Sequence, residues 1–152
     1  MISLFFNTRK RIGLLNNLLS SIYNTVQSAD NIEVFVTVDN DDSESKEFLD
    51  SLNFPNLNVR SIEKPSNLHT SINEMAEMAS GDFLFVLNDD VIFRTFHWDR
   101  KIIDNYMLTK NKELTSISKS SLDKEEGMGY LQSVLEEYPR GFGLAIIKGP
   151  FK

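Results

Sequence analysis

Residues 82–90 read DFLFVLNDD, an apolar run that ends in an asparagine and two adjacent aspartates. Residues 82–87 have the length of a strand, and their nearly unbroken apolar character is typical of a strand covered on both faces of a sheet. In open sheets of this kind, ligands bind beyond the carboxyl ends of the parallel strands. This stretch therefore predicts an α/β fold, with a polar site at Asn88, Asp89 and Asp90.

The sequence around this stretch alternates strands with helices. Further strands are expected at residues 2–6, 32–38, 57–62 and 143–147. Helices are expected at residues 11–26, from Ser43 to about residue 53, at 70–79 and at 97–108, because apolar residues recur there at helical spacing. Gly81 is expected at the C′ position that ends the helix at 70–79. Strand–helix–strand alternation with short connections predicts a mainly parallel central sheet flanked by helices.

Composition excludes several classes of protein. The 152-residue chain has a formal net charge of -6 and no cysteine. An acidic chain offers no broad basic surface for a nucleic-acid backbone, so no nucleic-acid partner is expected. The absence of cysteine excludes disulfides and thiolate metal sites. No apolar run approaches the roughly 20 residues that cross a bilayer.

The acidic ends of two predicted strands are the candidate functional positions. Adjacent carboxylates at Asp89 and Asp90 repel each other unless a cation lies between them, and oxygen ligands without histidine or cysteine favour Mg²⁺ or Mn²⁺. Such an ion would let an acidic protein bind a diphosphate. The alternative is a solvated turn or a helix cap. Asp39 ends the strand at 32–38 and could accept hydrogen bonds from a base or ribose, whereas Asp42 and Ser43 are expected to cap the next helix.

Four blocks of residues, taken together and in this order, resemble the family 2 glycosyltransferases of the GT-A fold. The blocks are Asn7-Thr8-Arg9, Val38-Asp39-Asn40-Asp41, the stretch from Asn67 to Asp82, and Leu87-Asn88-Asp89-Asp90. The last block stands where the family has a Leu-Asp-x-Asp metal motif, and Asn88 replaces the first aspartate of that motif. The resemblance implies a GT-A-type, Rossmann-like sandwich.

The resemblance also implies a role for each matching residue. Asp39 is expected to accept a hydrogen bond from the nucleotide base, and Thr8 to approach the base or ribose through its backbone. Asn88 and Asp89 are expected near the ribose and the first phosphate. Asp90 is expected to be the ligand of a Mn²⁺ or Mg²⁺ ion.

The reaction that the resemblance implies is metal-assisted transfer of a sugar, with inversion, from a nucleoside-diphosphate sugar to a carbohydrate, lipid-linked or protein acceptor. Arg9 and Lys64 are candidates for contacts with the diphosphate, and a plain surface charge is the alternative for each. Trp98 could stack on a sugar ring or belong to the core. Two other functions stay open: a non-catalytic nucleotide-sugar-binding module or fragment, and a nucleotidyltransferase.

The acceptor side is the least defined part of the sequence. We expect one domain over residues 1–152, with a nucleotide-binding part at 1–95 and a partial acceptor side at 96–152. The family's general base comes from the second half of its domain, where Glu136, Glu137 and Asp99 are weak candidates. A homodimer that covers apolar surface stays open. A cytoplasmic location is expected, with peripheral membrane association as an alternative because many sugar acceptors are lipid-linked.

Overall fold

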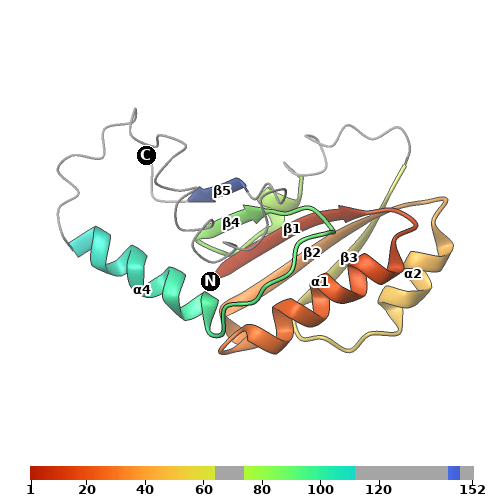
Figure 1. Cartoon of the computed structure of the whole chain (residues 1–152). Coiled ribbons are helices and arrows are strands. Elements are labelled where there is room, and N and C mark those ends of the chain that lie inside the picture. The colour runs from red at the N-terminus through yellow and green to blue at the C-terminus, as the bar shows by residue number, and fades with distance from the viewer. Residues whose placement is uncertain (64–73, 112–143, 148–152) are drawn as a thin grey trace.

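One five-stranded sheet forms the centre of the molecule (Figure 1). The computed structural model describes residues 1–63, 74–111 and 144–147. The strands are β1 (Ile2–Thr8), β2 (Ile32–Asp39), β3 (Leu57–Ile62), β4 (Phe83–Val86) and β5 (Leu144–Ile147). Their order across the sheet is β3-β2-β1-β4-β5, and only the β4–β5 pair is antiparallel. The predicted α/β fold with a mainly parallel sheet is therefore confirmed.

Within the described residues, three α-helices and two further helical segments connect the strands. They are α1 (Ile12–Thr25), the 3-10 turn η1 (Ala29–Asn31), α2 (Ser43–Asp50), a helical segment at residues 74–78, and α4 (Trp98–Asn111). Asp42 caps α2, as the sequence predicts, by accepting a hydrogen bond from the Ser45 N–H at 3.2 Å. Among the helices of the described ranges, none is both long and apolar enough to cross a membrane.

Helices cover both faces of the sheet because alternate strand residues point to opposite sides. Leu4 and Phe6 of β1 belong to the main core, together with α1 residues such as Leu18 and with Trp98 of α4. Phe5 lies between them in sequence and packs on the other face, in a smaller cluster with Met75. Figure 1 shows α1 and α2 on the same side of the sheet. This two-sided covering explains why β1, β2 and β4 read as nearly continuous apolar runs.

The direction of the chain across the sheet changes at β1. From β1 the chain moves through α1 to β2 and then through α2 to β3, on one side of β1. It then returns to place β4 on the other side of β1. The carboxyl ends of β1 and β4 therefore flank the topological switch point, where open α/β sheets bind their ligands.

At the opposite, amino edge of the sheet, Glu33 ties β1 and β2 to the segment before β4. Its carboxylate accepts hydrogen bonds from the Ser3 hydroxyl at 2.6 Å, the Ser80 N–H at 2.7 Å, the Ser80 hydroxyl at 2.9 Å and the Gly81 N–H at 3.0 Å. Burial alone would raise the pKa of Glu33, but these hydrogen bonds together hold that pKa below its ordinary value.

Gly81 has a different role from the one its sequence position predicts. No glycine of the described residues has a positive φ, so Gly81 is not a left-handed helix cap. It is buried against β1, where an added Cβ would lie 2.2 Å from the Ser3 hydroxyl and 2.9 Å from the Ser3 backbone nitrogen. Glycine is required here because the backbone approaches β1 too closely for a side chain.

Candidate functional site

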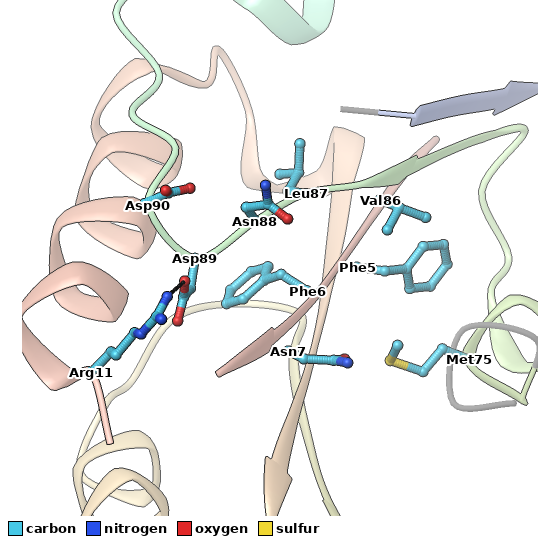
Figure 2. A pocket seen from close by; sticks show the side chains of 10 residues that line it. All are labelled: Phe5, Phe6, Asn7, Arg11, Met75, Val86, Leu87, Asn88, Asp89 and Asp90. Atoms are coloured by element: carbon cyan, nitrogen blue, oxygen red, sulfur yellow. Dashed lines mark hydrogen bonds and ion pairs between the residues drawn. The ribbon is translucent and has the colours of Figure 1, made fainter. Parts of the chain in front are cut away.

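A pocket opens at the switch point between β1 and β4 (Figure 2). Its volume is about 420 Å³, within the size range of small-molecule sites. It is lined by Phe5, Phe6, Asn7, Arg11, Met75, Val86, Leu87, Asn88, Asp89 and Asp90. The floor is apolar and the rim carries amide, guanidinium and carboxylate groups. This combination suits a ligand that is held by a few polar contacts above an apolar surface.

The three polar residues after β4 differ in exposure although they are adjacent in sequence. Asn88 and Asp90 are exposed, whereas Asp89 is buried with an exposed fraction of 7%. Figure 2 shows the Asp89 side chain turned towards Arg11 and the Asp90 side chain leaving the backbone in another direction. Asp90 has no hydrogen bond or ion pair with any other described residue. The turn therefore presents Asp90 and Asn88, but not Asp89, to solvent.

Both oxygens of Asp89 are engaged by residues that follow β1. The Thr8 hydroxyl donates to Oδ2 at 3.3 Å, and Nη1 of Arg11 lies 3.2 Å from Oδ1. Thr8 is itself buried at the end of β1. The backbone hydrogen bonds between β1 and β4 continue past the end of β4, because the Leu87 N–H donates to the Phe5 carbonyl at 2.7 Å. Asp89 is consequently fixed by its position beside β1.

The acidic tip of β2 contacts the same loop from its other side. Arg9 lies 3.2 Å from Asp39 and 3.1 Å from Asp41. The Lys10 N–H donates to Asp42, and this bond and those from Ser45 hold the pKa of Asp42 below its ordinary value, although burial alone would raise that pKa. The β1–α1 loop therefore lies between two acidic strand ends and contacts both of them.

A left-handed backbone at Lys10 lets the loop contact both tips. Its φ is 51°, a conformation that is uncommon for a residue with a side chain. Arg9 on one side of this residue reaches the β2 tip, and Arg11 on the other side reaches Asp89. Backbone strain of this kind concentrates at functional sites.

The two acidic strand tips lie at the same edge of the sheet but do not line one pocket. Asp39 ends β2 and Asp90 follows β4, with β1 between them. Asp89 and Asp90 line the pocket, whereas Asp39 does not. A ligand that contacts both Asp39 and Asp90 must extend from the pocket across the end of β1.

Arg11 is the site residue that sequence reasoning missed. It follows the first strand in the basic run Arg9-Lys10-Arg11, and that run was the available signal. The side chain of Arg11 lines the pocket, while its backbone occupies the N-cap position of α1 without a capping hydrogen bond from that side chain.

Two residues considered as candidates have structural roles. Asp99 is fully buried near the amino edge of the sheet, where it accepts hydrogen bonds from the Gln27 and Ser28 N–H groups and from the Asn31 amide. This position gives it no route to an acceptor hydroxyl, so Asp99 is not kept as a general base. Trp98 is fully buried, with its ring centroid 4.6 Å from that of Phe93, and belongs to the core.

The other candidates lie outside the described residues. They are Lys64, Glu136 and Glu137. Within the described ranges, no group of three or more histidine, aspartate, glutamate or cysteine side chains is arranged to hold a metal ion. A metal held by Asp90 would therefore take some of its ligands from groups other than these four kinds of side chain in the described residues.

A sequence model of glycosyl transferase family 2 matches residues 3–111 of the chain. The chain belongs to this family. The match covers β1 to α4 and thus includes both acidic strand ends, the β1–α1 loop and the pocket. No match was found among curated proteins.

Solved structures of glycosyltransferases share the fold of this family 2 domain. Residues 1–349 of S. aureus TarS give a TM-score of 0.56 at 18% identity, covering 71% of this chain and 32% of that chain. The same TarS fragment in complex with UDP-GlcNAc gives 0.52 at 15% identity, covering 71% and 31%. The mannosyltransferase PcManGT from Pyrobaculum calidifontis, in complex with GDP-Man and Mn²⁺, gives 0.50 at 16% identity, covering 64% and 29%. These likenesses confirm the predicted GT-A-type fold.

This family 2 chain spans about a third of the length of these structures. The likeness shows the fold, and the division into a nucleotide-binding part at 1–95 and a partial acceptor side at 96–152 stays a prediction.

Proposed function

We propose that this chain binds a nucleoside-diphosphate sugar across the carboxyl ends of β2, β1 and β4 and transfers the sugar to an acceptor hydroxyl. The observation that carries the proposal is the pocket at the β1–β4 switch point, with Asn88 and the exposed Asp90 at its rim, in a chain of glycosyl transferase family 2. In this fold class the switch point is the place where a nucleotide binds.

The nucleoside part of the donor lies towards β2 in this proposal. Asp39 accepts a hydrogen bond from the base, and the Thr8 backbone at the end of β1 approaches the base or ribose. Arg9, already 3.2 Å from Asp39, orients this carboxylate and contributes positive charge towards the diphosphate. Asn88 and Asp89 lie near the ribose and first phosphate, and Lys64 supplies a further charge.

The chemistry at the rim fits a divalent ion that binds together with the donor. Asp90 supplies one exposed carboxylate, and the Asn88 amide oxygen is a neutral oxygen ligand beside it. Mg²⁺ commonly binds proteins through one or two carboxylates together with substrate phosphates and water, and Mn²⁺ accepts the same oxygen ligands. When bound, such an ion neutralises the negative charge that develops on the departing diphosphate.

The proposed transfer is a direct displacement with inversion at the anomeric carbon. The acceptor oxygen forms a bond to that carbon as the bond to the diphosphate breaks, and the acceptor proton passes to a carboxylate base. Glu136 and Glu137 are the remaining candidates for this base.

Calorimetry and transfer assays test the two halves of the proposal. UDP and GDP are the first nucleotides to titrate, with and without Mn²⁺, because UDP-GlcNAc and GDP-Man are present in two of the similar structures. We expect saturable binding of one nucleotide that Mn²⁺ strengthens, and transfer or hydrolysis of the matching sugar nucleotide that Asp90→Ala abolishes. Activity unchanged in Asp90→Ala would remove the mechanism. Binding without any product would favour the non-catalytic module.

A further inference from the structure

We infer that Arg11 is a further donor-binding residue whose guanidinium binds the donor diphosphate, and that Asp89 holds this guanidinium at the pocket wall. The inference deepens the proposed function and depends on it. It assigns a ligand to Arg11, and it makes Asp89 a positioning residue rather than a metal ligand.

The position of Arg11 is the first argument. It lines the same pocket as Asn88 and Asp90, and its side chain enters from the start of α1 (Figure 2). A phosphate group that reaches Asp90 from the β1 side therefore passes the Arg11 guanidinium.

The charge of the pocket is the second argument. Among the described residues that line it, Asp89 and Asp90 are acidic and Arg11 is the one cation. A diphosphate would add further negative charge to a lining whose described side chains already carry a net negative charge. A guanidinium within the pocket wall is suited to offset that charge, because it presents planar pairs of N–H donors to phosphate oxygens.

The free bonding capacity of Arg11 is the third argument. Its side chain has an exposed fraction of 60%, and its ion pair with Asp89 engages Nη1. A guanidinium carries five N–H donors on three nitrogens, so it can keep this contact and bind a phosphate through others. Because the exposed side chain also lines the pocket, such donors are accessible to a ligand there.

Asp89 has the opposite properties. It is 7% exposed, and its two oxygens are engaged by Thr8 and Arg11. Coordinating a metal would require Asp89 to give up these contacts. Because the contacts arise from adjacent strands, Asp89 is suited to fix the direction of the Arg11 guanidinium, as an outer partner fixes a directly binding group.

A purely structural role for Arg11 would be to neutralise the buried Asp89. The two roles differ in how removing the charge of Arg11 changes the affinities for ligands. Phosphate binding makes affinity for pyrophosphate depend on Arg11 while affinity for the nucleoside does not. Neutralisation alone changes the stability of the fold and affects all ligands alike.

The test measures dissociation constants for pyrophosphate, UDP, GDP, uridine and guanosine by NMR titration of the chain and its variants. Arg11→Gln removes the charge, Arg11→Lys keeps it, and Arg100→Gln is the matched control. Arg100 is an exposed arginine that is also paired with an aspartate, Asp104 on α4, outside the pocket lining. Thermal unfolding of every variant shows which ones keep the fold.

We expect Arg11→Gln to weaken the binding of pyrophosphate and of the diphosphate nucleotide by roughly 10- to 100-fold, as for the loss of a hydrogen bond between charged groups. Arg11→Lys is expected to recover part of this loss, and Arg100→Gln to change nothing. If folded Arg11→Gln or folded Arg11→Lys binds pyrophosphate as tightly as the wild type, the inference is overturned while the proposed function stands. The inference is also overturned if Arg11→Gln weakens the binding of nucleosides and of diphosphates by the same factor. A wild type that binds neither diphosphate nucleotide overturns the proposed function as well.

Discussion

Arg9 lies 3.2 Å from Asp39, so a guanidinium covers the carboxylate to which we assign the nucleotide base. Asp39 has an exposed side-chain fraction of only 16%, whereas Arg9 is 46% exposed. A carboxylate can accept several hydrogen bonds at once, so a base N–H can share Asp39 with Arg9. The ion pair thus holds Asp39 in one orientation before a donor arrives.

Asp39→Asn is expected to weaken binding of the preferred nucleoside diphosphate by about 10- to 100-fold, because the base loses a charged acceptor. Calorimetry with UDP and GDP measures this change. Asp41→Asn is the matched control: Asp41 is paired with the same arginine at 3.1 Å but has no proposed ligand contact. Equal losses in the two variants would contradict the assignment of the base to Asp39.

Asp90→Asn is expected to weaken Mn²⁺ binding in the presence of nucleotide by at least about 10-fold, since it removes the exposed carboxylate at the pocket rim. Asp89→Asn should change Mn²⁺ binding much less, because Asp89 is turned towards Arg11. Titration of Mn²⁺ at fixed nucleotide concentration, followed by electron paramagnetic resonance, gives both constants. A larger effect from Asp89 would show that the buried carboxylate is the metal ligand.

The sequence predicted the fold well because β1, β2 and β4 are covered on both faces. Their apolar runs stand out from the helical periodicity between them. β3, whose residues are partly buried or exposed, also has the predicted bounds. The rule that ligands bind beyond strand ends selected Asp39 and the turn from Asn88 to Asp90, which do lie at one edge of the sheet.

The contacts within the site could not be predicted because they depend on the lateral order of the strands. Arg9 meets Asp39, and Arg11 meets Asp89, only because β1 lies between β2 and β4. Spacing along the chain does not specify that order. The left-handed backbone at Lys10 could not be predicted either, since a lysine does not indicate this conformation. Gly81 was misassigned because close backbone packing and a helix end both select glycine.

Stability is expected to fall in acid in a way that depends on Glu33. The pKa of this carboxyl is lowered in the folded protein, so its contribution is complete above the ordinary value of 4.5 and is lost as the pH falls below it. Urea unfolding between pH 7 and pH 3 measures the effect.

Glu33→Gln should make the free energy of unfolding less dependent on pH below 4.5, because the glutamine does not titrate. Glu47→Gln, an exposed substitution on α2, serves as the control. An unchanged acid dependence in Glu33→Gln would mean that other carboxyl groups produce it.

Gly81→Ala is expected to lower the free energy of unfolding by about 2–3 kcal/mol, the usual range for overpacking a filled site. The added methyl would meet the Ser3 hydroxyl at 2.2 Å, and rotation of that hydroxyl would not relieve the contacts at 2.9 Å with the Ser3 nitrogen and 3.0 Å with the Met1 carbonyl. Those two atoms belong to the backbone at β1. A shift of β1 would also disturb the hydrogen bonds that Ser3 and Gly81 donate to Glu33.

Gly13→Ala is the matched control for this substitution. Nothing lies within 4 Å of a Cβ added at Gly13, which is in the first turn of α1. Alanine there should leave stability unchanged or raise it by up to about 1 kcal/mol, through its higher helix propensity. Urea denaturation of both variants measures their free energies of unfolding. If Gly81→Ala is as stable as Gly13→Ala, the backbone at residue 81 can move away from β1, and close packing is not the reason for glycine at that position.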